Sequence, residues 1–170
     1  SLPDVKSTLL VSPGHVDFAA EVERSLQVLD CAILVVSAPD GPQGHTLTLW
    51  RLLEKHGIPV FLFLNKMDQP VDRPALLEKL KRSLSPALLD FTAYGQDSFW
   101  EDAALGDELA LQEYLEKGAL ADGTLRRLVG SRRCFPCFFG AALKTQGVQE
   151  LLDALSRFAP RPPYGAEFSA

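Results

Sequence analysis

A polar tetrad, Asn65-Lys66-Met67-Asp68, directly follows the apolar run 60–64. Open α/β sheets bind their ligands at the carboxyl ends of the strands, which is where such a tetrad would lie. A carboxylate such as Asp68 can accept two hydrogen bonds at once. Guanine presents two neighbouring donors, the ring N1–H and the exocyclic amine, and adenine does not. The tetrad therefore predicts a guanine-binding site; the alternative is a polar turn in which Asp68 caps a helix.

Two more side chains of the tetrad suit the same base. The amide of Asn65 both donates and accepts, so it can contact the base edge and the neighbouring loops. The methylene stem of Lys66 can lie along the base plane while its ammonium group stays in a polar environment. We therefore expect Asn65, Lys66 and Asp68 to act together on the base.

A second candidate loop, residues 12–18, contains Pro13-Gly14-His15. Gly14 lets the backbone approach an anion closely because it has no Cβ. A helix beginning near His15 would direct its free N–H groups and the positive end of its dipole at the same place. A terminal phosphate would fit there, with His15 orienting an attacking water. A plain strand-to-helix turn explains the same three residues.

A third candidate loop, residues 140–144, follows the apolar run 134–139 and reads Gly-Ala-Ala-Leu-Lys. Its small residues, Ala141 and Ala142, would let a backbone N–H reach the carbonyl oxygen of guanine. A simple turn between a strand and a helix is the alternative.

The overall composition fits one soluble globular domain of 170 residues, with 46% hydrophobic and 23% charged residues. No apolar stretch approaches the ~20 residues of a membrane span, and the first residues do not resemble a signal peptide. The net charge of −5 argues against a domain whose main task is to grip nucleic acid. This net charge does not exclude a partner such as the ribosome, which the chain could contact through a local basic patch. We interpret the dense basic cluster at 126–127 and 132–133 as a solvated helix face.

The three cysteines, an odd number without a secretory signal, fit a reducing cytoplasm. Cys134 and Cys137 form a C-x-x-C pattern inside an apolar run. Strand residues an odd number of positions apart point to opposite faces, and the chain has no second pair to complete a zinc site. We therefore interpret these cysteines as structural and predict no metal site.

Apolar runs alternate with stretches of helical periodicity along the chain. The runs predict strands at 7–11, 31–36, 60–64 and 134–139, and the periodicity predicts helices over 15–30, 46–56, 73–84 and 149–158. Residues 85–131 are expected to be mostly helical and less regular. This alternation is typical of an α/β fold with a parallel sheet and helices on both faces. All three candidate loops would lie at the carboxyl ends of strands.

With their order and position, the three loops resemble the GTPase domain of the elongation factor G family, and within it the tetracycline-resistance ribosomal protection proteins. The resemblance runs from about residue 8 to residue 160 and includes the run 13–18, Asp40-Gly41 and Gly57-Ile58-Pro59 ahead of the tetrad. It implies a partial P-loop-NTPase-like three-layer fold. It also implies a cytoplasmic translational GTPase that binds the ribosome and hydrolyses GTP.

Roles follow from the resemblance position by position. Asn65 and Asp68 would read guanine and Lys66 would pack on the base, with the backbone of Ala142 and Leu143 close by. Gly14 would contact the γ-phosphate, and His15 would position the hydrolytic water when the ribosome activates the factor.

The chain also departs from the family. No G-x-x-x-x-G-K-[ST] motif occurs in it, so the backbone cradle and the lysine for the phosphates are missing, as is the first switch. Val11 replaces the aspartate that holds the magnesium shell, and valine offers no oxygen ligand. Ala141 replaces a serine, which is a mild change.

We interpret the chain as a piece of a longer protein. Residues 1–160 would be a partial GTPase domain, and residues 161–170 a linker and the start of a barrel domain. We expect weak or absent binding of GTP and GDP, no appreciable hydrolysis, and magnesium only in an intact parent. Missing central sheet segments would expose strand edges and favour self-association. The alternatives are a degenerate GTPase fold that serves as a non-catalytic binding module, and an incidental tetrad in another α/β protein.

Overall fold

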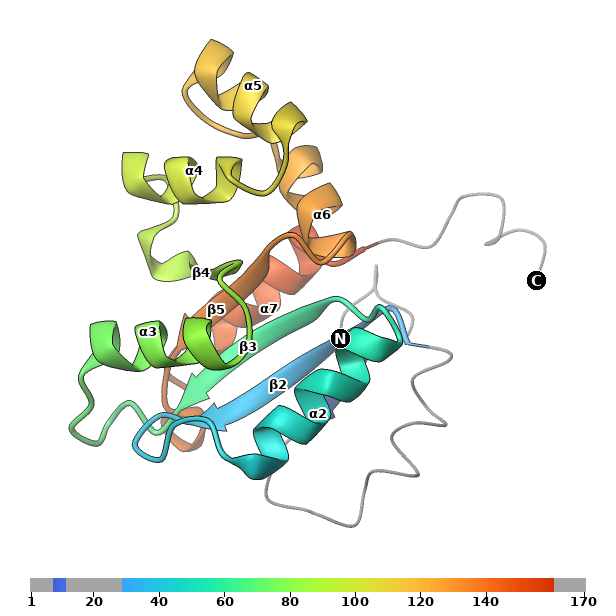
Figure 1. The fold of residues 1–170 in the computed structure, drawn as a ribbon. Coiled ribbons are helices and arrows are strands. Elements are labelled where there is room, and N and C mark those ends of the chain that lie inside the picture. Colours follow the sequence, from blue (N-terminus) through green and yellow to red (C-terminus); the bar gives the residue numbers. More distant parts are fainter. Residues whose placement is uncertain (1–7, 12–28, 161–170) are drawn as a thin grey trace.

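The computed structural model describes residues 8–11 and 29–160, in which strands and helices alternate along the chain (Figure 1). The strands are β1 (Thr8–Val11), β2 (Cys31–Ser37), β3 (Val60–Asn65), β4 (Leu88–Asp90) and β5 (Phe135–Phe139). The α-helices are α2 (Gly44–Lys55), α3 (Arg73–Ser83), α4 (Asp97–Ala104), α5 (Glu108–Lys117), α6 (Asp122–Gly130) and α7 (Val148–Phe158). Two short 3-10 helices, η3 (Phe91–Ala93) and η4 (Ala142–Lys144), follow β4 and β5. The helix expected over 15–30 lies almost wholly outside the described residues.

The strands form one parallel sheet in the order β1-β2-β3-β5-β4. A parallel sheet covered on both faces needs strands that are apolar throughout. In β3 this holds for every residue except Asn65, which is only half-buried. The predicted α/β fold is therefore confirmed, and the tetrad begins at the carboxyl end of the middle strand.

Two apolar cores lie on opposite faces of the sheet. Ile33 and Phe61 join the core formed with α4, α6 and α7, whereas Leu34 and Leu62 join the core formed with α2 and α3. Figure 1 shows α2 and α3 on the near side of the sheet and α7 behind it. This is the three-layer arrangement that the sequence predicted. No helix within the described ranges is long and apolar enough to cross a membrane.

The helix boundaries follow local sequence signals. Asp72 precedes α3 and accepts a hydrogen bond from Ala75 N at 3.1 Å, as expected of an N-cap. Pro74 lies in the first turn, where a missing N–H has no cost. After α2, Gly57 takes a φ of 66°, a left-handed conformation that suits glycine and ends the helix as predicted.

Strand β4 was not predicted, because we expected residues 85–131 to be mostly helical. It pairs with β5 through Leu88↔Phe135, and Leu88 and Leu89 enter opposite cores. Three residues are too few to give a recognisable period of two. The rest of the segment contains α4, α5 and α6, as expected.

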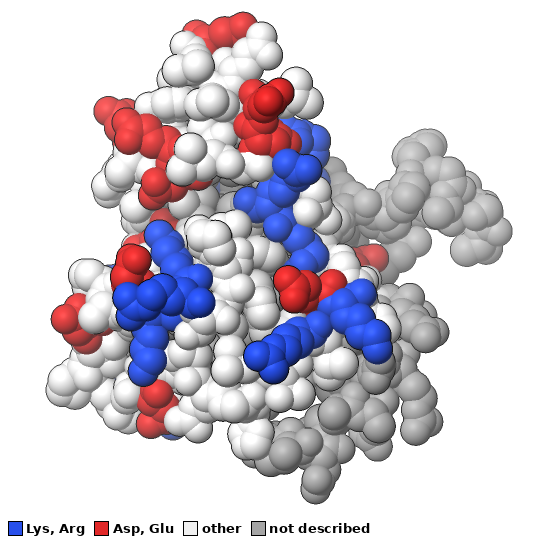
Figure 2. Space-filling model, in the orientation of Figure 1, with Lys and Arg blue, Asp and Glu red and all other residues white. Residues whose placement is uncertain are grey.

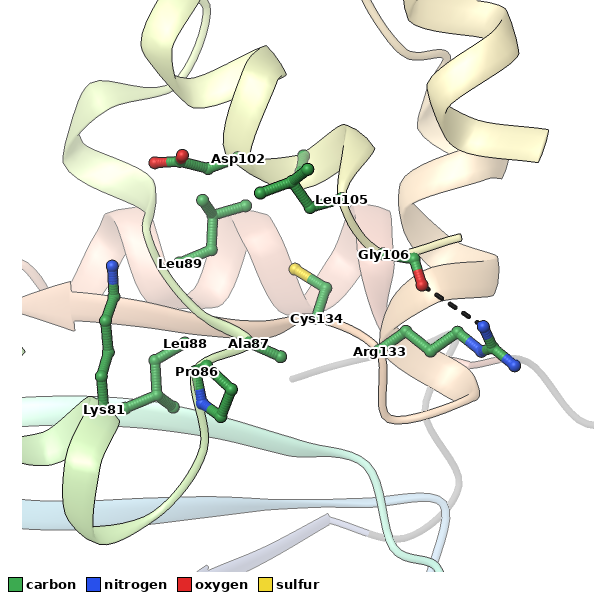
Figure 3. A pocket seen from close by; sticks show the side chains of 11 residues that line it. Lys81, Pro86, Ala87, Leu88, Leu89, Asp102, Leu105, Gly106, Arg133 and Cys134 are labelled. Atoms are coloured by element: carbon green, nitrogen blue, oxygen red, sulfur yellow. Dashed lines mark hydrogen bonds between the residues drawn. The ribbon is translucent and has the colours of Figure 1, made fainter. Parts of the chain in front are cut away.

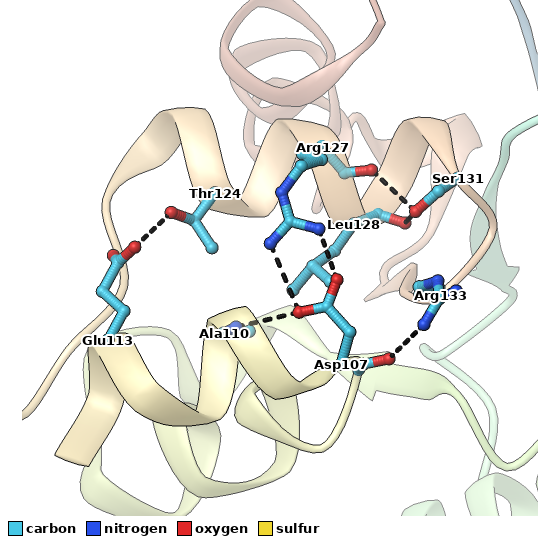
Figure 4. A network of polar contacts seen from close by, with 9 residues as sticks. Asp107, Ala110, Glu113, Thr124, Arg127, Leu128, Ser131 and Arg133 are labelled. Atoms are coloured by element: carbon cyan, nitrogen blue, oxygen red, sulfur yellow. Dashed lines mark hydrogen bonds and ion pairs between the residues drawn. The ribbon is translucent and has the colours of Figure 1, made fainter.

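The prediction that the arginine cluster forms a solvated helix face holds only for Arg126 and Arg127. Helix α6 ends at Gly130, so only part of the cluster lies on it. Arg127 contacts both carboxylate oxygens of Asp107, and Arg133 donates to the carbonyl oxygen of Gly106 at 3.3 Å (Figure 4). These contacts join α6 to the start of α5.

Arg132 is half-buried and takes a left-handed φ of 60°. It donates to the carbonyl oxygen of Ile58, and its guanidinium lies 5.3 Å from the Trp50 ring and 4.9 Å from the Phe135 ring. Burial lowers the pKa of Arg132 below its ordinary value. The residue therefore holds the turn before β5 against α2 and the segment that leads into β3.

Cys134 and Cys137 lie in opposite cores, as predicted, and neither forms a disulfide. Burial raises the pKa of Cys134 to about 12 and that of Cys137 further still. Both thiols are thus structural groups in the apolar interior.

Strand β1 pairs directly with β2, from Thr8↔Cys31 to Val11↔Leu34. Strand β2 therefore has a neighbour on each side, and the exposed edge that we expected inside the sheet is not found in the part of the chain that the structure describes. In that part, the unpaired edges are the outer sides of β1 and β4.

Candidate guanine-binding site

Asn65 ends β3 at the sheet edge where ligands of open α/β folds bind. It pairs in register with Ser37 of β2, and its carbonyl oxygen accepts a hydrogen bond from Ala38 N at 2.8 Å. The backbone of the tetrad is thereby tied to the loop after β2. The Ser37 hydroxyl beside it is buried and has no hydrogen-bond partner among the residues that the structure describes.

The side chain of Asn65 ties the tetrad to the third loop. Its Oδ1 accepts a hydrogen bond from the backbone N–H of Ala142 at 2.8 Å. This contact matches the expectation that Asn65 bonds neighbouring loops. It engages the Ala142 N–H, so a base that used this donor would displace Asn65 Oδ1.

Backbone bonds reinforce the link between the two loops. Gly140 N donates to Leu64 O at 3.0 Å, and Met67 N donates to Gly140 O at 3.0 Å. Lys66 lies between them with a φ of 65°, a left-handed conformation that turns the chain sharply after the strand. The exposed Lys66 side chain is therefore free of the core, as a residue that packs on a base must be.

Gly140 is required where the two loops meet. A Cβ at this position would lie 2.1 Å from the carbonyl oxygen of Gln146 and 2.9 Å from the Phe63 ring. Ala141 and Gln146 then exchange backbone hydrogen bonds at 3.0 and 3.1 Å, which closes the loop on itself. Close backbone approach thus explains why glycine begins this loop.

Asp68 is the carboxylate expected to read the base. Its side chain is 34% exposed, and its Oδ2 lies 3.4 Å from Nζ of Lys144 in the third loop. Because both groups reach solvent, this ion pair contributes little to stability. Asp68 therefore remains accessible to a ligand, with Lys144 as a neighbour that competes for the same oxygen.

The structure brings together most of the site residues that the sequence predicted. Asn65 is hydrogen-bonded to Ala142, the neighbour of Ala141, and Asp68 reaches the same loop through Lys144. The Leu143 side chain is fully exposed and packs against nothing. Gly14 and His15 lie outside the described residues.

Three positions beside the site were not predicted: Ser37, Gly140 as a close-approach glycine, and Lys144. Lys144 belongs to the third candidate loop, but it lies 76 residues from Asp68 in the sequence, so no sequence pattern indicates their ion pair. The predicted strand ends at residue 36, one residue short of Ser37, with which β2 ends in the structure. Only the strand register, which aligns Ser37 with Asn65, reveals its place.

The described residues offer no cluster of donors that suits a metal ion. Within the described ranges, no group of three or more histidine, cysteine, aspartate or glutamate side chains could hold one. Val11 is the last residue of β1, and valine offers no oxygen ligand to magnesium.

A parallel α/β sheet with an Asn-Lys-x-Asp tetrad after its middle strand, joined to a small-residue loop after the next strand, defines a GTPase-type nucleotide-binding domain. Residues 3–161 match the Elongation factor Tu GTP binding domain, and the chain belongs to that family. The resemblance found in the sequence is thereby confirmed.

Three relatives show how the chain compares with whole proteins. Tetracycline resistance protein TetO of Streptococcus pneumoniae is 32% identical over 179 residues, covering 95% of this chain and 28% of that protein. Elongation factor G 1 of Geobacter sulfurreducens is 33% identical over 204 residues, covering 91% and 30%. Mitochondrial ribosome-releasing factor 2 of Danio rerio is 31% identical over 221 residues, covering 94% and 29%. The chain thus spans less than a third of the length of these relatives.

A solved structure from Thermus thermophilus has the same fold. It superimposes with a TM-score of 0.74 at 23% identity, covering 88% of this chain and 29% of that one.

Proposed function

We propose that this chain binds the guanine base of GTP or GDP as part of a translational GTPase that acts on the ribosome. The observation that supports this most is the hydrogen bond from Ala142 N to Asn65 Oδ1, which holds the two base-reading loops together. Asp68 would accept from the guanine N1–H and amine, and Lys66 would lie along the base. Leu143 would lend backbone beside it.

The partner follows from family membership and from the relatives' names. Two relatives are an elongation factor and a ribosome-releasing factor, and a third is a tetracycline resistance protein. The ribosome is the partner that fits an elongation-factor-type domain, and the cytoplasm is the compartment that fits a chain with three cysteines, an odd number.

The chain as given would not hydrolyse GTP appreciably. Phosphoryl transfer depends on positioning and charge stabilisation by a phosphate loop, a first switch and magnesium. The sequence has no G-x-x-x-x-G-K-[ST] motif, and Val11 supplies no magnesium ligand. Gly14 and His15 would serve the γ-phosphate and the attacking water only where those parts are present.

Calorimetric titration of the chain with GDP, and with ADP as the control, tests this proposal. We expect GDP to bind more weakly than about 1 μM and ADP not at all. GDP affinity at about 1 μM or tighter would contradict the impaired phosphate site. Equal heats from ADP and GDP would contradict guanine recognition.

A second candidate function is a non-catalytic binding module with a degenerate GTPase fold, which Val11 favours. A version of the gene extended upstream separates the two. A phosphate loop that confers magnesium-dependent GTP hydrolysis supports the GTPase. Stable folding without hydrolysis supports the binding module.

A further inference from the structure

A cavity of about 370 Å³ lies far from the tetrad, between the start of β4 and helix α4 (Figure 3). Residues 86–89 form one side of it, and Ala103 and Leu105 at the end of α4 form another. Lys81 of α3 and Arg133 border it on two further sides, and the Arg133 side chain extends toward the carbonyl oxygen of Gly106. We call this cavity the β4 groove.

The β4 groove runs along an unpaired strand edge. Pro86 and Ala87, in the turn before β4, line it together with Leu88 and Leu89 of the strand, although Leu88 and Leu89 point to opposite faces of the sheet. Consecutive strand residues share one groove only where that groove follows the edge of the strand. Strand β4 is the last in the sheet order, and its one partner among the described residues is β5.

The backbone of Leu88 faces this open edge. Phe135 N of β5 donates to Ala87 O at 3.0 Å, so the carbonyl of Ala87 points toward β5. Peptide groups of successive residues in a strand alternate in direction, so the Leu88 carbonyl points away from β5. The Leu88 N–H makes only a long bond, 3.4 Å to Ser85 O. An unpaired edge of this kind can accept a further strand.

The walls of the groove combine apolar side chains with a positive charge excess. Leu88, Leu89 and Ala103 are buried at its base, whereas Leu105 is 77% exposed at its rim. Lys81 and Arg133 contribute two positive charges and Asp102 one negative charge. Figure 2 shows uncharged surface in this region, with basic groups on either side of it. A ligand that matches the groove is apolar and carries a carboxylate.

We propose that the β4 groove binds an extended peptide segment of a partner protein, which adds to β4 as a sixth strand. An apolar side chain of the segment packs on Leu89 and Leu105, and an acidic side chain meets Lys81 or Arg133. Backbone bonds to the open edge supply affinity, and the side-chain contacts supply selectivity. This site is independent of guanine binding.

Nuclear magnetic resonance titration of the ¹⁵N-labelled chain tests the proposal. The probe is an acetylated and amidated pentapeptide of alternating valine and glutamate. We expect saturable shifts confined to the amides of residues 87–90 and 102–106. A peptide with lysine in place of glutamate, and one with methylated backbone nitrogens, should each bind at least about tenfold more weakly. Equal binding of either control peptide, or shifts elsewhere, would overturn the proposal.

Variants of exposed residues give the second arm. Arg133→Glu and Leu105→Asp should each weaken peptide binding about tenfold, and Arg82→Glu, on α3 but outside the groove, should leave it unchanged. Equal loss in all three variants would overturn the assignment to this groove. The proposal would also be overturned if acetate alone reproduced the shifts. The same holds if the shifts arose on raising the protein concentration without peptide, because a second copy of the chain would then occupy the groove.

Discussion

Asn65 Oδ1 accepts a hydrogen bond from Ala142 N at 2.8 Å, although 77 positions separate the two residues in the chain. The bond joins the loop after β3 to the loop after β5 before any ligand is bound. A site whose loops are already held in place loses less conformational entropy on binding. The two loops therefore form one hydrogen-bonded unit.

Replacing Asn65 should uncouple this unit. Asn65→Ala removes the acceptor of Ala142 N, which should lower the free energy of unfolding by about 1 kcal/mol and weaken GDP binding about tenfold. Asn65→Asp keeps an acceptor oxygen, so it should retain most of the stability. Denaturant unfolding and a fluorescent GDP titration measure both effects. Equal stability of wild type and Asn65→Ala would show that the bond is not formed in solution.

The three thiols should be unreactive in the folded state. Cys31, Cys134 and Cys137 are all buried, and burial raises the pKa of Cys134 to about 12. The thiolate is the reactive form, so it is scarce near neutral pH. A thiol reagent at mildly alkaline pH, about 8, should label none of the cysteines until denaturant is added. Rapid labelling of any one of them without denaturant would contradict the packing of the two cores.

The link between α5 and α6 should make stability depend on pH. The hydrogen bond from Arg127 holds the pKa of Asp107 below its ordinary value of 3.8. Because the pKa of Asp107 is lower in the folded state, the ionised carboxylate stabilises the fold fully at pH values above its ordinary pKa. This stabilisation is lost as the pH falls through the lowered value.

Asp107→Asn keeps an N-cap for α5 but removes the charge that pairs with Arg127. We expect the free energy of unfolding to fall by about 0.5–1 kcal/mol near neutral pH, a small loss because Arg127 is partly exposed and solvent screens the pair. On acidification below about pH 4, the variant should lose less further stability than the wild type. Arg127→Gln should behave alike, and the double variant should add little to either. Chemical unfolding at several pH values measures this, and identical pH profiles for wild type and Asp107→Asn would contradict it.

The sheet and its main site loops could be predicted because their signals are local. Strands such as β3 are unbroken apolar runs, and the tetrad follows at once. Strand β4 could not be found, since its three residues take their conformation from pairing with β5 rather than from their own pattern. Arg132 was misread for a similar reason: its burial against Trp50 and Phe135 depends on chain segments far apart in sequence.

Within the site, residue types were predictable and their partners were not. Asn65 and Asp68 stand out because few residue types can read a base edge. The packing of the two loops determines that Ala142 N donates to Asn65 and that Lys144 lies beside Asp68. Such contacts follow from strand order, which the sequence indicates only in outline.

The most direct test of guanine reading is the response of the ¹⁵N-labelled chain and its Asp68→Asn variant to three nucleotides, GDP, ADP and xanthosine diphosphate. Xanthine has a carbonyl where guanine has its amine, and an asparagine amide can donate to that carbonyl. We predict that GDP shifts the amides of residues 65–68 and 141–144 in the wild type and that ADP does not. The variant should bind xanthosine diphosphate more tightly than GDP. No response of these residues to GDP, or an unchanged preference for GDP in the variant, would contradict the assignment of Asp68 as the guanine reader.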